Sequence, residues 1–418
     1  MRKNNSPKKV LWLLFGLLFT CVALPGFCVL AIRLADAMYW LPGAASIGVY
    51  LVGFCLPATI YILATSGEHS RRRVFRLPSW VWFAVGAPIA IVAGQSLLLS
   101  RNGWFFWLPG ILAAGFAPLA AVALADQRLN YPTTWRRALI GIVSGSILAP
   151  MLTLLVSGIV TALAFALILP LREMAAQILA APSLEKMFYS PALILVLVEA
   201  AVVAPLVEEL FKPMAAAIMA KRLSGPAEAF LVGMAGGLGF AILENMLYES
   251  AGPRLWGGIA VLRSIGGVLH PLTAGLVAVG WYSFRTGQPH GKRLLLTLYA
   301  LAVTIHGLWN GGLTILVSDI GTYFFGTRSW RFDIYGIGEA GIVIVFMLME
   351  AIALWWLLVA VTDRLRKPGE AQRAPLWMLH LDQSQSLALW AATLLAILAP
   401  LAGFYRPILE VYASKLLP

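Results

Sequence analysis

Long apolar runs separated by short polar loops dominate the chain. A membrane-spanning α-helix needs about 20 consecutive apolar residues, and about eleven of the runs reach that length. The pattern therefore predicts an all-α fold, a polytopic integral membrane helical bundle with about 11 transmembrane helices. We place the spans near residues 10–31, 46–66, 79–99, 104–125, 138–169, 191–220, 229–248, 257–284, 294–318, 337–361 and 386–404.

Lys and Arg are concentrated in alternate loops. The stretch "EHSRRRVFR" follows the second predicted span, Lys221 and Arg222 follow the sixth, and "DRLRK" follows the tenth. Because cytoplasmic loops carry the excess of Lys and Arg in membrane proteins, this alternation predicts a cytoplasmic N-terminus and a C-terminus outside. These loops also explain the formal net charge of +12, so we infer a lipid bilayer and no nucleic acid as the partner.

The composition excludes a soluble protein. Only 12% of the residues are charged and 60% are hydrophobic, with a mean hydropathy of +0.83, whereas soluble domains carry roughly 25% charged residues. The three cysteines, Cys21, Cys28 and Cys55, have no spacing typical of a metal site or a disulfide framework. Candidate chemistry must therefore be sought among the polar residues inside the apolar runs.

Four neighbouring spans, the sixth to the ninth, carry rare polar residues at one depth. An ionisable group inside a bilayer costs about 2.5–3.5 kcal/mol on insertion scales and tends to mark a functional site. Each of the four groups lies 13 to 15 residues from the cytoplasmic end of its span, which is about 20–22 Å at the rise of an α-helix. We therefore expect the helices to bring the four together. They are Glu208, Glu244, His270 and His306.

Helical spacing adds three more polar residues to this group. His306 and Asn310 are four residues apart and so share one face of a helix. Lys212 follows Glu208 by four residues and Glu209 by three. We expect Lys212 to pair with either glutamate and to lower the cost of burying it.

These residue types favour a hydrolytic site, in one of two versions. A carboxylate acts as a general base on water, and His and Asn donors stabilise an oxyanion, so a metal-free site for cleaving a peptide bond is one version. In the other, a divalent metal such as zinc is bound with an open position for water. The chain has no HExxH motif, and we favour the version without a cofactor. The candidate metal ligands are Glu208, Glu244, His270 and His306.

An ordered set of motifs resembles a known family. The motifs "EELFK", "FAILEN", Arg263 with His270, and "HGLWN" are similar to those of the PrsW family of intramembrane proteases, a branch of the superfamily that includes the CAAX prenyl endopeptidases. The resemblance implies cleavage of a peptide bond in a membrane protein substrate, such as an anti-sigma-factor-like regulator. It also implies a bacterial protein of the cell (inner) membrane.

The resemblance implies a role for each candidate residue. Glu208 is the base that activates water, Glu209 supports it, and His270 orients the water or shuttles a proton. CAAX enzymes have histidine where this chain has Glu244, so Glu244 either orients a histidine or binds a metal. The other expected roles are oxyanion stabilisation by His306 and Asn310, substrate binding by Asn245 and Arg263, and support of the glutamates by Lys212.

We divide the chain into an N-terminal four-helix segment of unassigned role (1–137), a PrsW-like protease core (138–362), and a cytoplasmic linker with a C-terminal helix (363–418). Two other functions are compatible with the pattern. Buried Glu and His also form proton relays in transporters, although the inverted repeats typical of transporters are not visible here. A non-catalytic membrane scaffold is the other. We expect Glu350, which lies mid-span in the tenth run, to face the same cavity or to pair with Lys212.

Overall fold

The computed structural model describes residues 75–99, 106–168, 197–251, 256–317 and 337–366. All the regular elements in these ranges are helices, and seven of them are long and apolar enough to cross a membrane. The predicted all-helical membrane bundle is confirmed. The first, second and eleventh predicted spans lie outside the described residues, so the total of about 11 spans stays a prediction.

The seven long helices match seven predicted spans, and the sixth predicted span consists of several short helical segments. The helices before it are α4 (Trp80–Leu99), α5 (Trp107–Leu129), α6 (Trp135–Val143), the π-helical η3 (Ser144–Leu148) and α7 (Ala149–Ile168). The sixth span comprises the π-helical η5 (Glu199–Val203), α11 (Ala204–Phe211), α12 (Met214–Met219) and the 3-10 turn η6 (Ala220–Arg222). After it come α13 (Pro226–Ala251), α14 (Trp256–Ile265), α15 (Leu269–Arg285), α16 (Gly291–Val317) and α18 (Ile337–Leu365).

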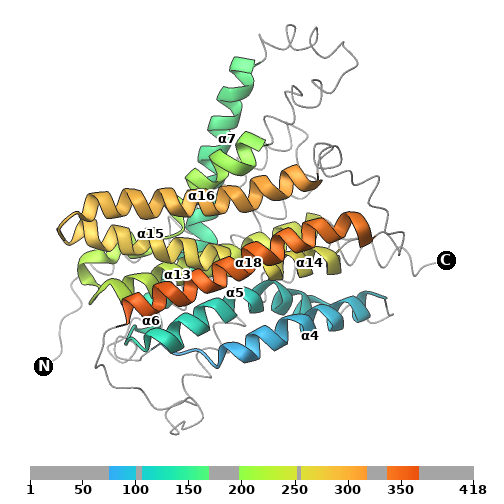
Figure 1. Ribbon diagram of the computed structural model, residues 1–418, viewed down its shortest axis with the longest axis horizontal. Helices are drawn as coiled ribbons and strands as arrows, with labels where there is room; N and C mark the ends of the chain where they lie inside the picture. Colours follow the sequence, from blue (N-terminus) through green and yellow to red (C-terminus); the bar gives the residue numbers. More distant parts are fainter. Residues whose placement is uncertain (1–74, 100–105, 169–196, 252–255, 318–336, 367–418) are drawn as a thin grey trace, which may run out of the picture.

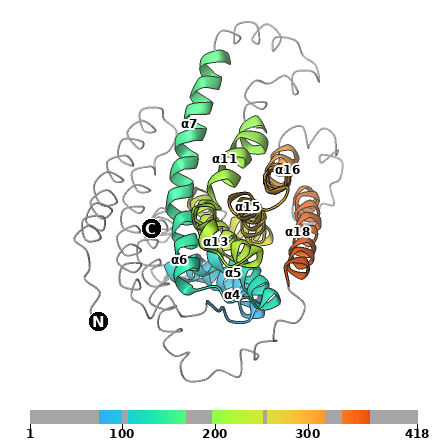
Figure 2. The same ribbon diagram turned by 90° about the vertical axis from the view of Figure 1, so that its left-hand side faces the viewer.

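Helix α13 forms the centre of the bundle. Of its most apolar stretch, 83% is buried, against 22% for α16 and for α18. It packs most extensively on α15, and also on α5 and α6, and Figure 2 shows it surrounded by the other helices, with α7 and α18 on opposite sides. The less buried helices therefore present apolar surface to lipid, and α7 projects beyond the rest of the bundle (Figure 1).

Two of the central helical spans are interrupted where they carry polar residues. In the sixth span, α11 ends at Phe211 and α12 begins at Met214, with Pro213 between them; proline has no N–H for the helical ladder. In the eighth span, α14 ends at Ile265 and α15 begins at Leu269. The two interruptions lie next to Lys212 and His270, so the chain breaks helices at the level where its polar residues meet.

Two glycines of α13 allow both interruptions to approach the central helix. A Cβ atom at Gly236 would overlap the carbonyl oxygen of Lys212, and one at Gly237 would overlap the carbonyl oxygen of His270. Small residues permit this backbone contact between membrane helices. The two glycines therefore hold the polar residues of the sixth and eighth spans against one face of α13.

Ion pairs join helix ends at one side of the bundle. Arg128 at the end of α5 pairs with Asp363 near the end of α18 at 2.7 Å, and Arg137 of α6 pairs with Glu228 at the start of α13 at 2.5 Å. All four residues belong to ends that the loop charges assign to the cytoplasm. Their shared side agrees with the predicted order of spans, and the orientation of the termini stays a prediction.

Candidate active site

The two adjacent glutamates and Lys212 lie inside the bundle, on α11 and at its end. Glu208 is 7% exposed, and Glu209 and Lys212 are fully buried. Helix α11 turns Glu208 and Lys212 toward one another because they are one helical turn apart. Charges at this depth must be paired or bonded to be tolerated, and the neighbouring helices supply the partners.

The Lys212 ammonium lies at the centre of the polar cluster. Its Nζ atom is 2.8 Å from Glu208 Oε2 and 2.9 Å from Glu209 Oε1, so it pairs with both glutamates, where the sequence led us to expect one or the other. It is also 2.7 Å from His270 Nδ1 and 3.5 Å from His306 Nδ1. The ring of Phe240 lies 4.3 Å from the same nitrogen and adds a cation–π contact.

His270 bridges Lys212 and Glu244. Its Nε2 atom lies 2.7 Å from Glu244 Oε2, and its Nδ1 atom faces the ammonium of Lys212. Because an ammonium only donates hydrogen bonds, Nδ1 accepts one, and the proton of a neutral ring lies on Nε2 and is donated to Glu244. His270 is therefore held in a single tautomer by two charged neighbours.

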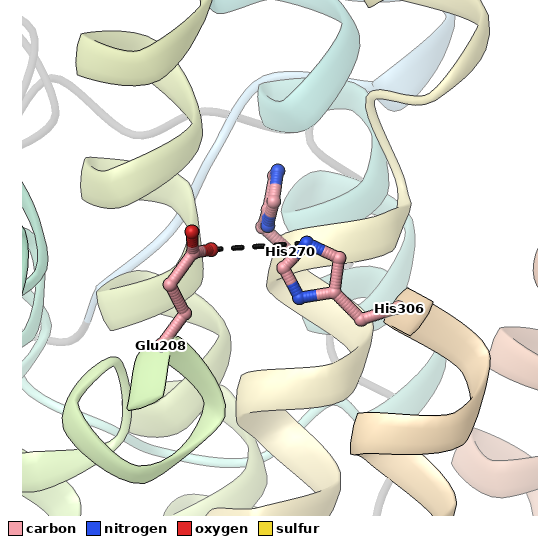
Figure 3. A group of neighbouring side chains, drawn as sticks. All are labelled: Glu208, His270 and His306. Atoms are coloured by element: carbon pink, nitrogen blue, oxygen red, sulfur yellow. Dashed lines mark ion pairs between the residues drawn. The ribbon is translucent and has the colours of Figure 1, made fainter. Parts of the chain in front are cut away.

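His306 is held in a similar way by Glu209 and Asn310. Its Nδ1 atom lies 2.8 Å from Glu209 Oε1, and its Nε2 atom lies 3.1 Å from the amide nitrogen of Asn310. Since that amide nitrogen only donates, Nε2 accepts and Nδ1–H donates to Glu209. The same Nε2 atom is 3.7 Å from Glu208 Oε2, and Figure 3 shows the Glu208 carboxylate turned toward both histidines.

Arg263 connects Glu244 to the rest of the bundle. Its guanidinium bonds Glu244 Oε2 at 2.5 Å through Nη2 and Asn245 Oδ1 at 2.7 Å through Nε, and it lies over the ring of Tyr248. Asn245 in turn donates to the backbone oxygen of Ala114 on α5. Both ends of the Asn245 amide and two sides of the guanidinium thus have partners inside the protein, which favours positioning of Glu244 over direct substrate binding.

The candidate residues include a possible metal site. One ligand atom each from Glu208, His270 and His306 lies within 4.8 Å of the other two. Two histidines and one glutamate match a common zinc ligand set, and each histidine has a carboxylate on its second ring nitrogen, as metal-bound histidines usually do. By residue type the set therefore matches a zinc site, and the Lys212 ammonium lies 2.7 Å from His270 Nδ1 and 2.8 Å from Glu208 Oε2 within it. Glu244, which we also considered as a ligand, lies outside this group and bonds His270 instead.

Two carboxylate oxygen atoms of the cluster have room for a further partner. Glu209 Oε2 is buried with no hydrogen-bond partner among the described residues, and Glu208 Oε2 has only the Lys212 ammonium, at 2.8 Å. Buried carboxylate oxygens are normally bonded, so these two atoms have capacity for a water, a metal or a substrate group. The side chains of Glu244 and Arg263 are 15% and 17% exposed, which marks the side from which the cluster is accessible.

The structure brings the candidate residues into one cluster, and their roles stay predictions. It joins the four residues expected at one depth with the three added by helical spacing: Glu208, Glu244, His270 and His306 with Glu209, Lys212 and Asn310. It also adds Phe240, Tyr248 and the backbone of Ala114. Glu350 does not pair with Lys212; in the described part of the chain its Oε2 atom has no hydrogen-bond partner.

Comparison with known proteins identifies the family. The family model described as "PrsW family intramembrane metalloprotease" matches residues 135–361, which is more than half of the chain, and the chain belongs to this family. No curated protein and no solved structure matches it. The protein is therefore a multi-pass membrane protease, and the transporter and scaffold interpretations are not supported. The roles of the individual residues and the division into domains stay predictions.

Proposed function

We propose that the protein is an intramembrane endopeptidase in which Glu208 activates a water molecule to hydrolyse a peptide bond of a membrane-embedded substrate. The observation that supports this role best is the state of the Glu208 carboxylate. Its Oε2 atom is buried, pairs with Lys212 Nζ at 2.8 Å, lies 3.7 Å from His306 Nε2, and has no further hydrogen-bond partner among the described residues. A general base must be able to accept a proton from water at hydrogen-bond distance, and this oxygen has that capacity.

Glu209 supports the cluster in this proposal, because its Oε1 atom already has two partners. It accepts from Lys212 and from His306, and so fixes both side chains. Lys212 compensates the negative charge of the two carboxylates, without which burial of both would be costly. The two adjacent glutamates therefore have different tasks: Glu208 exchanges the proton, and Glu209 holds the groups around it.

The proposed reaction adds one water molecule to a peptide bond and needs no other reactant. Glu208 takes a proton from water, the water oxygen attacks the carbonyl carbon, and the carbonyl oxygen becomes an oxyanion. Asn310 uses one amide N–H for His306, and we assign its second N–H to the oxyanion. His306, whose N–H donates to Glu209, positions Asn310 for this role. Collapse breaks the C–N bond, and Glu208 returns its proton to the leaving amine. His270, with both ring nitrogens engaged by Lys212 and Glu244, holds the Lys212 ammonium beside Glu208.

A second version of the chemistry uses a metal in place of the Lys212 ammonium. Glu208, His270 and His306 would hold it, and when bound it supplies Lewis-acid polarisation of the scissile carbonyl. The carboxylates of Glu244 and Glu209 would then orient the two histidines. For the substrate we propose a membrane protein cleaved within or near its span, of the regulator type that the family resemblance implies.

The test compares two Glu→Gln variants in detergent-purified protein with a library of transmembrane peptides. Glu208→Gln removes the base and keeps the shape, and we expect cleavage to fall by a factor of at least about 10³, within the range of lost general-base catalysis. Glu350→Gln is the matched control, because Glu350 is also a carboxylate inside a span but lies on α18 outside the cluster, and we expect near wild-type cleavage. Equal activity of wild type and a folded Glu208→Gln variant would refute the proposal.

A chelator arm separates the two versions of the chemistry. Cleavage that persists with chelator supports the metal-free version. Cleavage that is lost with chelator and restored by zinc shows that the metal version operates.

A further inference from the structure

The positive charge at the centre of the site is supplied by a side chain of the protein, the ammonium group of Lys212. Lys212 Nζ lies 2.8 Å from Glu208 Oε2 and 2.7 Å from His270 Nδ1. These two residues are also two of the three candidate metal ligands. The side chain that occupies the space between them is therefore an ammonium, at hydrogen-bond distance from the atoms that a metal would need.

An ammonium and a metal ion compete for the same lone pairs. The ammonium of Lys212 only donates, so the lone pair of His270 Nδ1 is directed at it and is not available to a metal in this arrangement. A divalent ion held by Glu208 and His270 would also lie close to a positive charge in a poorly screened environment. Binding of the metal at its candidate site is thus opposed by both the geometry and the charge of Lys212.

The charge of the cluster leads to the same conclusion. Three carboxylates, Glu208, Glu209 and Glu244, are paired with two cations, Lys212 and Arg263. With both histidines neutral, the sum is one negative charge, which a divalent ion would overcompensate. Without the Lys212 charge the sum is two negative charges, which a divalent ion neutralises.

The ammonium is held firmly in this place. Lys212 is fully buried, its backbone N–H donates to the backbone carbonyl oxygen of Glu208 at 2.9 Å, and its own carbonyl oxygen packs against Gly236. The ring of Phe240 covers the charge. Withdrawal of the side chain would break contacts with two carboxylates and one histidine at once.

We propose that Lys212 is the resident cation of this centre, and that a divalent metal binds Glu208, His270 and His306 only in exchange for it. The inference concerns the site of the proposed function. It is tested by metal binding without substrate, so its failure is distinct from a failure of Glu208-dependent cleavage.

The experiment measures zinc affinity of the full-length protein in detergent by competition with a chromophoric chelator. Lys212→Met keeps the length of the side chain and removes its charge. We expect it to bind one zinc ion at least about 100-fold more tightly than wild type. A change of about 100-fold in affinity is a modest change in binding free energy compared with the repulsion between two positive charges at close distance. Lys221→Met is the control, because Lys221 is exposed, and its affinity should equal that of wild type.

Additional variants assign the gained zinc to this site and guard against misfolding. Combining Lys212→Met with His270→Ala should abolish the gain, and a gain that persists would contradict the proposal. If Lys212→Met does not fold, the proposal is tested by comparing zinc binding by the wild type with zinc binding by His270→Ala. Weak zinc binding that His270→Ala leaves unchanged supports the proposal. Tight wild-type binding of one zinc ion that His270→Ala weakens at least about 100-fold would overturn it.

Discussion

Replacing Arg263 by methionine tests how the site is held together. Arg263 is the only described cation besides Lys212 that pairs with a carboxylate of the cluster, and it bonds Glu244 and Asn245 at the same time. Methionine keeps the apolar stem and removes both hydrogen bonds and the charge. Glu244 then stays between the helices without its guanidinium, and Asn245 Oδ1 loses its donor.

The magnitude follows from these two losses. Removing one partner of a buried pair costs about 3–5 kcal/mol, and we take the lower end because the side chains of Glu244 and Arg263 are 15% and 17% exposed. The unsatisfied amide oxygen adds about 1 kcal/mol. We therefore expect the free energy of unfolding to fall by about 4 kcal/mol. Adding Glu244→Gln to the variant should restore part of it, because no unpaired charge then remains.

The assay is reversible unfolding in detergent together with cleavage kinetics. As a positioning residue, Arg263 should affect kcat by about 10²-fold, because misplacement of catalytic groups slows the chemical step, and should leave KM nearly unchanged. A direct contact with substrate would instead raise KM at constant kcat. A variant with unfolding free energy within about 1 kcal/mol of wild type and a raised KM would refute the reasoning and favour substrate binding by Arg263.

Two further substitutions test the packing that carries the site. Gly237→Ala places a Cβ atom on the carbonyl oxygen of His270 and should lower the free energy of unfolding by at least about 2 kcal/mol. Gly258→Ala is the control, because a Cβ there would meet nothing within 4 Å, and it should be neutral or stabilising by up to about 1 kcal/mol. Thermal unfolding compares the two variants, and equal effects would contradict the packing described for Gly237. Arg137→Met leaves the fully buried Glu228 without its cation and should lower the free energy of unfolding by about 3–5 kcal/mol. Adding Glu228→Gln to the same chain should partly reverse this loss. A loss below about 1 kcal/mol would show that the ion pair contributes little to stability.

The depth of polar residues was the most informative feature of the sequence. Helices have a constant rise. Counting from basic loop residues for Glu208, His270 and His306, and from the start of the span for Glu244, placed the four residues at one level, and the structure joins them. Helical spacing likewise predicted the pairing of Lys212 with the glutamates and of His306 with Asn310. These predictions succeeded because the spans of a membrane bundle are helical, and they held although the sixth and eighth spans are interrupted.

Contacts between separate helices could not be predicted in the same way. Arg263 precedes His270 by seven residues and lies near the predicted outer interface, where a charge needs no partner, so nothing in the sequence pointed to Glu244 and Asn245. The pairing of Glu209 with His306 depends on the rotation of α11 against α16, which is set by packing. The sequence contains no signal that we could use to predict the π-helical segments η3 and η5. The break after α11 does have a signal, because Pro213 lacks the N–H that a continuous helix needs.

Single-turnover cleavage in H₂¹⁸O tests the role of Glu208 most directly. If Glu208 activates water as a base, the first turnover places one ¹⁸O atom in the new C-terminal carboxylate of the product and none in Glu208. If Glu208 were instead a nucleophile that forms a mixed anhydride, and water opened this anhydride at the Glu208 carbonyl, the first product would carry an unlabelled oxygen from the enzyme, and ¹⁸O would appear in the peptide that contains Glu208. Label in the product alone is the result that we predict, and label in Glu208 would contradict the account.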